Sequence, residues 1–370
     1  MKHPQNHVFD MTPADLEAWC GARSMKRFRA RQILEWIYQH HEPDPSRWTN
    51  LAERDRRYVA DELTIHSGRV VSHQLASDDT QKLLVQWNDS PAPGSLPILS
   101  HDDPSLQTEC VMIPSLGHDT KRKTACISSQ IGCPVGCRFC ASGLAGLDGN
   151  LSTGRIVEQV WRLGRLEGVG RISHVVFMGM GEPLSNFSAV VGAIRRLAAP
   201  APEGLGISAR RITLSTVGLP KAIERLADEL DLPITLALSL HAPTDEIRRE
   251  LIPWAEYTTI DELLTACDRW FARTGREITL EYTLMGGLND EPAHATKLAE
   301  LAGTLRANVN LIRYNEVEGL PYRRPADRSV NRFQTILRDR GVNCHIRASR
   351  GRDIAAACGQ LRHEHGNNPA

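Results

Sequence analysis

The sequence has no excess of charge of either sign and no long apolar run. Lysine and arginine together number 44, as do aspartate and glutamate, so any nucleic-acid partner must be held by a local basic patch. No segment approaches the roughly 18 apolar residues of a membrane span. The first residues also lack the apolar core of a signal peptide. We therefore expect a cytoplasmic protein without a membrane partner.

The composition excludes a disordered or fibrous chain. Hydrophobic residues make up 41% of the sequence and charged residues 24%, which is typical of a globular protein. With 370 residues, the chain is longer than most single cores, so we expect one large domain and a small accessory domain.

The first third of the chain changes from helical to β-like patterns. Helical periodicity covers residues 12–20, 27–40 and 50–63, and short β-like runs follow at 68–75 and 81–87. A stretch rich in proline, glycine and serine at 90–95 is typical of a linker. We predict a helical accessory domain at 1–64 and a short β segment with a linker at 65–104.

The rest of the chain alternates between apolar runs and amphipathic helical stretches. The runs lie at 123–128, 173–179, 211–215, 234–240, 278–284, 308–314 and 343–348, and the helical stretches include 154–167, 220–230, 260–273, 293–305 and 328–340. This alternation predicts an α/β fold with a parallel sheet, and the number of units favours a partial (β/α)6-type TIM barrel at 105–360. Chemistry is then expected at the carboxyl ends of the strands. Residues 361–370 are predicted to be a flexible tail.

Nine cysteines are unevenly spread, and three of them fall within eight residues. Cys133, Cys137 and Cys140 have the spacing C-x3-C-x2-C in a loop after the first predicted barrel strand. In a reducing compartment, such clustering indicates metal or redox chemistry rather than structural disulfides. Other cysteines, such as Cys267 and Cys344, lie in apolar patterns that indicate core positions.

Three thiolates leave one coordination position open. A structural zinc site needs a fourth ligand at comparable spacing, and the first histidine after the motif, His174, already belongs to the next predicted strand. A [4Fe–4S] cluster held by three cysteines instead has one iron free to bind a substrate or cofactor. A zinc knuckle completed from elsewhere, or three cysteines without metal, are the alternatives.

The cysteine motif resembles the signature of the radical S-adenosylmethionine (SAM) superfamily. Other motifs narrow the resemblance to the RlmN/Cfr family of rRNA adenine methyltransferases, and they extend over nearly the whole chain. These motifs are Cys126-Ile127-Ser128-Ser129-Gln130-Ile131-Gly132-Cys133, Met178-Gly179-Met180-Gly181-Glu182-Pro183-Leu184, Leu238-Ser239-Leu240-His241-Ala242 and Ala356-Ala357-Cys358-Gly359-Gln360-Leu361. The resemblance implies one [4Fe–4S] cluster on Cys133, Cys137 and Cys140, and two SAM molecules per turnover.

The resemblance also implies a radical route, which suits adenine because its C2 and C8 carbons are poor nucleophiles. One SAM methylates Cys358, and a second is cleaved on the cluster to a 5′-deoxyadenosyl radical that takes hydrogen from this methyl group. The resulting methylene radical adds to the ring, and Glu109 accepts the ring proton. Cys126 then attacks Cys358, which releases methylated RNA and leaves a transient disulfide.

Taken alone, each of these three residues also has a structural interpretation. Cys126 lies in a strand-like run where a buried cysteine is common, and Cys358 follows a short helical pattern. A lone glutamate on a β-like run, such as Glu109, is often a solvated edge residue. Gly351 supplies a mobile point near Cys358 that favours a swinging thiol.

The resemblance assigns the SAM-binding residues to the ends of successive predicted strands. They are Gly181 and Glu182, Ser215, Ser239 with Leu240 and His241, and Asn315. His241 alone is also compatible with a structural histidine, and Ser215 with a helix N-cap. The family usually has prolines around Asn315, and residues 311–317 of this chain have none.

Basic residues are concentrated at a few positions where RNA phosphates would bind. Four cations and Phe28 lie within residues 26–31, although a solvated helix face is the alternative. Further basic residues occur at Lys121-Arg122-Lys123, Arg323-Arg324, Arg347, Arg350 and Arg352. A target base would have to leave its stack to reach a barrel interior.

The hypothesis from sequence is a radical SAM enzyme that methylates C2 of an adenosine in 23S rRNA and, by resemblance, of one in tRNA. The alternatives are C8 methylation of the same rRNA adenosine and, from another class, a non-catalytic, metal-stabilised RNA-binding protein. We also expect a flavodoxin- or ferredoxin-type electron donor and a monomer.

Overall fold

A single large sheet organises the computed structural model, which describes residues 1–88, 104–115, 122–144 and 146–361. The sheet has ten strands in the order β1-β2-β3-β4-β7-β8-β9-β10-β11-β12, and β5 and β6 form a separate pair. The strand bounds are β1 Gly68–Leu75, β2 Gln81–Trp87, β3 Gln107–Pro114, β4 Lys123–Cys126, β5 Gln130–Gly132, β6 Leu147–Asn150, β7 His174–Phe177, β8 Ile212–Thr216, β9 Thr235–Ser239, β10 Ile278–Leu284, β11 Ala307–Arg313 and β12 Cys344–Arg347.

The sheet combines a parallel part with an antiparallel extension. From β4 through β7 to β12 every neighbouring pair is parallel, whereas β1, β2, β3 and β4 pair antiparallel. Strands β1 and β12 are the two edges, so the described strands form an open barrel. The predicted α/β partial barrel is confirmed, because buried apolar strands alternate with helices as the sequence pattern requires.

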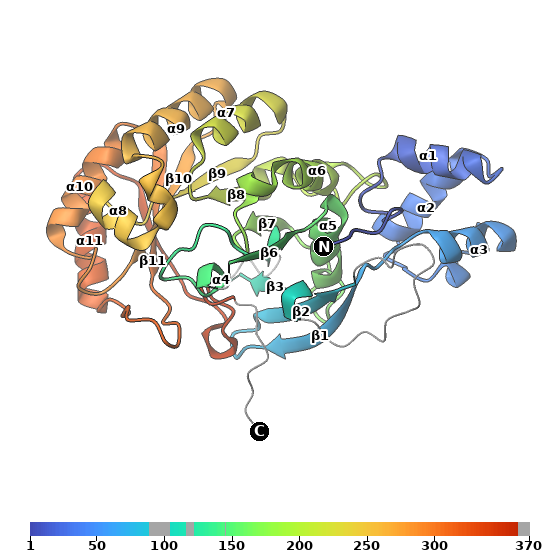
Figure 1. The fold of residues 1–370 in the computed structure, drawn as a ribbon, viewed down its shortest axis with the longest axis horizontal. Helices are drawn as coiled ribbons and strands as arrows, with labels where there is room; N and C mark the ends of the chain where they lie inside the picture. The colour runs from blue at the N-terminus through green and yellow to red at the C-terminus, as the bar shows by residue number, and fades with distance from the viewer. Residues whose placement is uncertain (89–103, 116–121, 145, 362–370) are drawn as a thin grey trace.

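Helices cover the outer side of the parallel strands (Figure 1). They are α5 Thr153–Leu163, α6 Phe187–Ala198, α7 Pro220–Glu229, α9 Ile260–Thr274, α10 Pro292–Gly303 and α11 Asp327–Asp339. The shorter α4 Ala141–Leu144 follows β5, and α8 Asp245–Leu251 follows β9. Local signals fix several ends: Thr259 and Glu262 form a capping box at the start of α9, and Gly275 ends it in the left-handed region. Helices α4, α6 and α8 were not among those named from the sequence.

Three helices at the amino end gather at one side of the molecule, as Figure 1 shows. They are α1 Pro13–Ala22, α2 Phe28–Tyr38 and α3 Glu53–Glu62. Helix α1 begins where predicted because Thr12 caps it in a capping box with Asp15, and Pro13 occupies its first turn. The predicted amino-terminal helical region is therefore confirmed.

The sheet crosses the boundary predicted near residue 105, because β1 and β2 pair with β3 in the same sheet as the barrel strands. The predicted linker at 90–95 and Lys121 lie outside the described residues. Leu361, at the start of the predicted tail, is buried and packs near Cys126, and residues 362–370 are not described. The division into domains stays a prediction.

Buried charges join the amino-terminal region to α5. The imidazole of His7 is fully buried, and its Nε2 lies 3.1 Å from Oε2 of Glu158. The same oxygen accepts hydrogen bonds from the amide and hydroxyl of Ser67, at 2.9 and 2.8 Å. Arg162 holds the other carboxylate oxygen at 2.7 Å. A buried carboxylate with this many partners is a fixed point for docking.

The pKa values of the pair follow from these contacts. Burial opposes the charge on His7, but hydrogen bonds with Asp10 and Glu158 outweigh it and raise the pKa of His7 above 6.5. Burial likewise opposes the charge on Glu158, and the His7 hydrogen bond outweighs it and lowers the pKa of Glu158 to about 2. Both groups are therefore charged at mildly acidic pH.

None of the helices in the described ranges combines the length and apolar character needed to cross a bilayer.

Replacing His7 by Ala leaves the Glu158 carboxylate buried without its imidazolium, and we expect the free energy of unfolding to fall by about 3 kcal/mol. The His7 contribution is complete below pH 6.5 and declines as pH rises through the higher folded pKa. The Glu158 contribution is present above pH 4.5 and is lost as pH falls toward 2. In anaerobic denaturant unfolding, His7→Ala should therefore show its largest loss of stability between pH 4.5 and pH 6.5.

The control for this variant is His345→Ala, because His345 is exposed on β12. It should change stability by less than about 0.5 kcal/mol. A His7→Ala deficit that does not vary with pH would contradict the ion-pair account.

Candidate active site

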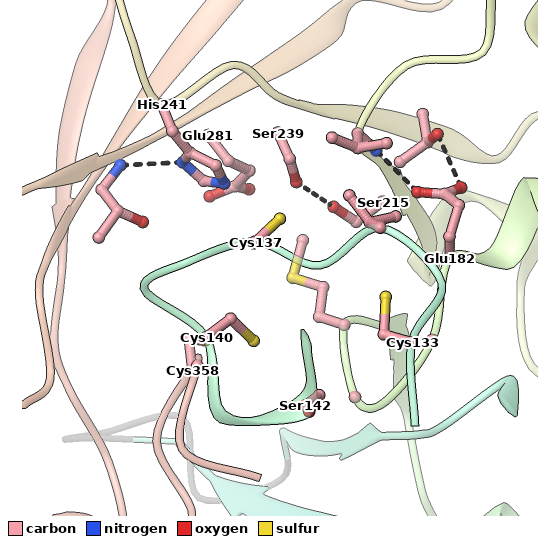
Figure 2. A pocket seen from close by; sticks show the side chains of 18 of the residues that line it. Cys133, Cys137, Cys140, Ser142, Glu182, Ser215, Ser239, His241, Glu281 and Cys358 are labelled. Atoms are coloured by element: carbon pink, nitrogen blue, oxygen red, sulfur yellow. Dashed lines mark hydrogen bonds between the residues drawn. The ribbon is translucent and has the colours of Figure 1, made fainter. Parts of the chain in front are cut away.

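A cleft of about 920 Å³ opens at the carboxyl ends of the parallel strands. Its lining comes from the loop of the three clustered cysteines, from the segments that follow β7, β8 and β9, and from the carboxyl-terminal segment. Figure 2 shows Cys133, Cys137 and Cys140 on one side of the hollow, with Glu182, Ser215, Ser239 and His241 opposite. The strand-end position is the one expected for chemistry in such a barrel.

The cysteine loop lies between β5 and α4 and is held by its own backbone. The Cys133 amide donates to the Gly146 carbonyl at 2.7 Å, and the Cys140 amide donates to the Cys137 carbonyl at 3.1 Å. Gly132 has a φ of 70°, and a β-carbon there would lie 1.9 Å from the Gly146 carbonyl oxygen. Only glycine fits this turn.

The three thiols are partly buried, and loss of contact with water decides their charge. Burial raises the pKa of Cys133 to about 12 and the pKa of Cys137 well above its ordinary value, and it also raises that of Cys140. A positively charged group is therefore needed to hold them as thiolates. In the described part of the chain, no three Cys, His, Asp or Glu side chains are grouped so that they could hold a metal ion.

Glu182 follows β7 and points into the segment after β8. Its carboxylate accepts hydrogen bonds from the amides of Leu184 and Val217, at 2.9 and 2.8 Å, and from the Thr216 hydroxyl at 2.8 Å. Burial raises its pKa to about 7, although these three hydrogen bonds oppose the shift. Glu182 thus fixes the segment after β8 to the segment after β7 and lines the cleft.

The preceding Gly181 is a position where a side chain is excluded. Its φ is 105°, and a β-carbon would lie 2.6 Å from the Ser129 hydroxyl oxygen. The backbone after β7 therefore lies against the segment before β5, which leaves the cleft beside Gly181 open to a ligand.

Three of the other predicted SAM-binding residues also line the cleft. The hydroxyls of Ser215 and Ser239 lie 3.2 Å apart on adjacent strands. Nδ1 of His241 accepts a hydrogen bond from the Thr283 amide at 3.1 Å, so a neutral imidazole carries its proton on Nε2. Burial lowers the pKa of His241 to about 3, which keeps the ring neutral.

Two predicted SAM-binding residues lie apart from this cleft. The Leu240 side chain is fully buried in the main hydrophobic core. Asn315 lines a second, adjacent pocket, where its Nδ2 donates to the Cys358 carbonyl at 3.2 Å. Asn315 therefore holds the carboxyl-terminal segment rather than lining the cleft.

Cys358 lies on the wall between the two pockets. Together with Met178 and Ile312 it lines both the cleft of the three clustered cysteines and the second pocket, and Cys126 lines the second pocket. Cys358 is exposed, whereas Cys126 is buried. Burial raises the pKa of Cys126 to about 12, nearby Cys358 adds to this, and Arg347 opposes it. The two cysteines remote in sequence thus meet beside the clustered three.

The backbone that carries Cys358 turns sharply at Gly351, whose φ is 60°. A β-carbon there would lie 2.8 Å from the Ala356 side chain and 2.9 Å from that of Thr80. Close packing explains this glycine as well as mobility does, because no side chain fits between the loop and the hairpin of β1 and β2.

Glu109 is buried on β3 and is not a solvated edge residue. It shares a face with Val111 and Ile113, since side chains alternate along a strand. Val111 packs with Cys126, and Ile113 lines the second pocket. Oε1 of Glu109 lies 2.6 Å from the ammonium of Lys82. Glu109 therefore lies on the face of β3 that borders the two reactive cysteines.

Of two further charged residues at the site, Glu281 was missed from the sequence and Arg347 was named there only as a candidate RNA contact. Glu281 lies inside the barrel on β10 and lines the cleft, and its Oε1 accepts a hydrogen bond from Asn310 at 3.0 Å. Arg347, predicted to contact RNA, lies in the second pocket 3.8 Å from Glu281. Burial opposes its charge, but Cys358, Glu281 and Cys126 outweigh this and raise the pKa of Arg347. The sequence signal that could have identified Glu281 is its position as the lone glutamate in the apolar run at 278–284.

The basic residues of the accessory region are partly neutralised. Arg29 pairs with Asp55 at 3.3 Å, and Arg31 pairs with Glu35 at 3.1 Å. Phe28 is 52% exposed, and the Arg29 guanidinium lies over its ring. An exposed aromatic ring beside cations is suitable for a nucleotide base, although the paired cations reduce the local charge.

Two family models and several known proteins match this chain. Residues 127–299 match the family model described as the radical SAM superfamily, and residues 6–65 match that of the ribosomal RNA large subunit methyltransferase N-terminal domain. The chain is 41% identical to the probable dual-specificity RNA methyltransferase RlmN of Rhodopirellula baltica, with 98% of this chain and 92% of the relative covered. It is 44% identical to the protein of the same name from Parasynechococcus marenigrum, with 94% and 96% covered.

One solved structure is similar to this chain in both fold and sequence. It is a radical SAM methyltransferase from Sphaerobacter thermophilus, 40% identical, with a TM-score of 0.87 over 97% of this chain and 100% of that one. The similarity extends over the accessory region as well as the barrel.

The three groups that hydrogen-bond to the Glu182 carboxylate are all donors. Replacing Glu182 by Gln therefore places an amide nitrogen, which is also a donor, against one of them. We expect the free energy of unfolding to fall by about 1–3 kcal/mol near pH 4.5 and by less at pH 8, because the raised pKa means that ionising the wild-type carboxyl costs stability as pH rises. Glu229→Gln is the matched control, since this exposed carboxylate has only an ion pair with Arg225, and it should cost about 0.5 kcal/mol or less. Equal losses in anaerobic denaturant unfolding would refute the anchoring role.

Proposed function

Because this chain belongs to the RlmN family of radical SAM RNA methyltransferases, we propose that it methylates C2 of an adenosine in 23S rRNA and of an adenosine in tRNA. One observation carries the proposal: Cys358 lines both the cleft of the three clustered cysteines and the pocket of Cys126. A methyl carrier needs this position, because it must meet the methyl chemistry on one side and a resolving thiol on the other.

The residues fit the cofactors of the family. Cys133, Cys137 and Cys140 supply three partly buried sulfurs in one short loop, as a [4Fe–4S] cluster with one open iron requires. Gly181, Glu182, Ser215, Ser239 and His241 border the same cleft and would hold SAM. When bound there, the cluster and SAM supply the radical that withdraws hydrogen from a methyl group.

The chain's own residues then act in sequence. Cys358 carries the methyl group and bonds through it to C2 of adenine. Glu109 accepts the proton from C2, and the ring recovers its aromaticity by giving one electron to the cluster that the cysteine loop would hold. The Cys126 sulfur attacks that of Cys358, and the bond from Cys358 to the methylene carbon breaks. That carbon takes up a proton, which balances the one that the Cys126 thiol gives up, and the methylated RNA leaves with a Cys126–Cys358 disulfide behind. Arg347 lies beside both sulfurs and would stabilise the attacking thiolate.

The RNA would reach this site by base flipping, because the cleft lies within the barrel and a stacked base cannot enter it. The exposed Phe28 and neighbouring cations of the accessory region would bind the flanking RNA. An electron donor of the flavodoxin or ferredoxin type and a monomeric state stay predictions.

The two cysteines should fail in different ways. Cys358→Ala removes the carrier, so it should give neither methylated RNA nor a protein–RNA adduct. Cys126→Ala keeps the carrier but removes the resolving thiol, so the adduct should accumulate. Denaturing gels and mass spectrometry distinguish the two, and identical behaviour would reject the assigned roles.

The methylated carbon is tested by label loss. An rRNA fragment with deuterium at adenine C2 should lose its label during reaction with the reconstituted enzyme, while the same fragment labelled at C8 should keep it. Loss from C8 alone would replace the proposal by C8 methylation, and loss of neither would exclude this fragment as a substrate.

A further inference from the structure

We propose that Lys82 is a positioning residue for the proton-transfer step, because it holds the Glu109 carboxylate against the loop that carries Cys358. The inference rests on the proposed role of Glu109 as the base and adds the group that orients it. Lys82 lies in the β-like run at 81–87, outside the family motifs quoted from the sequence.

The first observation is a buried ion pair. Nζ of Lys82 lies 2.6 Å from Oε1 of Glu109, and the two side chains are 10% and 7% exposed. In the antiparallel pair of β2 and β3, Lys82 is opposite Val111 and Leu84 is opposite Glu109. Lys82 and Glu109 are therefore diagonal neighbours on one face, where long side chains reach each other. Burying either charge alone would be strongly unfavourable, so the pair keeps a defined geometry.

The second observation is a contact between Lys82 and the loop that carries Cys358. Nζ of Lys82 also donates to the Ala355 carbonyl at 3.4 Å. Ala355 has a φ of 48°, in the left-handed region, and lies three residues before Cys358. An ammonium group has three donors, so one side chain can hold both the base and this turn.

The hairpin between β1 and β2 fixes the rest of the loop independently of Lys82. Oδ2 of Asp78 accepts hydrogen bonds from the Gly351 amide at 3.1 Å and from Arg350 at 3.2 Å. The Ser77 amide donates to Asp353 at 2.8 Å. These contacts hold the loop but do not involve Glu109, so they provide a control for general loosening of the loop.

The role in the chemistry follows from charge. As the bond between the ring carbon and its hydrogen breaks, the electron pair stays with the ring and the proton moves to the Glu109 carboxylate. Lys82 keeps its three protons throughout. Its positive charge favours the ionised carboxylate that must accept the proton, and its two contacts set the carboxylate's position relative to Cys358.

The test uses anaerobically reconstituted enzyme with Cys126→Ala, so that the RNA adduct is retained, and an rRNA fragment deuterated at the carbon that is methylated. Lys82→Met should slow label loss roughly 10- to 100-fold and move the acidic limb of the pH–rate profile to higher pH. Methylation of Cys358, measured by mass spectrometry, should proceed normally. Lys82→Arg, which keeps the charge, should restore the acidic limb.

Two controls isolate the effect. Lys221→Met removes an exposed lysine on α7 and should leave label loss unchanged. Asp353→Asn loosens the loop alone, so any decrease in rate should occur without a shift of the pH profile. Should Lys82→Met fail to fold, Lys82→Gln, which keeps a hydrogen-bond donor without the charge, decides the same question.

The outcomes separate this inference from the function on which it rests. Normal label loss with Glu109→Gln would remove Glu109 as the base and overturn both. Slow label loss with Glu109→Gln but a normal rate and pH profile with Lys82→Met, or with Lys82→Gln, would overturn the role of Lys82 alone. A shifted profile for Lys82→Met that Lys82→Arg restores would support it.

Discussion

Parallel pairing of the strands from β4 through β7 to β12 is the constraint on which the site depends. Parallel strands all end at the same edge of the sheet, so the residues that follow them meet there even when they are far apart in sequence. The cysteine loop comes after β4 and β5, Glu182 after β7, His241 after β9 and Cys358 after β12. The cleft is the place where these carboxyl ends converge.

The antiparallel extension adds a second wall to this site. Because β3 pairs antiparallel with β4, Val111 lies opposite Cys126, and the face of β3 with Glu109 borders the pocket of the two reactive cysteines. The hairpin of β1 and β2 then supports the loop before Cys358 from outside the barrel. The carboxyl-terminal segment with the exposed Cys358 is thereby held by the part of the sheet that precedes the barrel.

Burial determines the charge of the groups around the cleft. His241 is kept neutral, and the clustered thiols are protonated until a positive group binds. Glu182 is held at the point between its two forms, with a pKa of about 7. Such groups respond strongly to a bound charge because little water lies around them to screen it. Arg347 has the opposite effect in the second pocket, where it favours thiolates.

Features that depend on neighbouring residues could be predicted from the amino-acid sequence. The apolar runs matched β4, β7, β8, β9, β11 and β12 to within one or two residues at each end and β10 fully, whereas β5 and β6 had no predicted run. The matches follow because a strand buried on both faces must be apolar along its length. The three clustered cysteines were found for a similar reason, since their spacing within one loop suffices to define a cluster site. The family motifs assigned Cys126, Glu109 and Cys358, whose roles stay predictions.

Contacts between side chains of distant segments could not be predicted in this way and became known from the folded structure. The ion pair of Lys82 with Glu109 depends on the register of β2 with β3, and the place of Arg347 beside Glu281 depends on the order of β10, β11 and β12. Neither the register nor the order of strands is encoded in local periodicity, because each results from the packing of the whole sheet. For the same reason Asn315 and Leu240, both assigned to SAM by motif, lie outside the cleft.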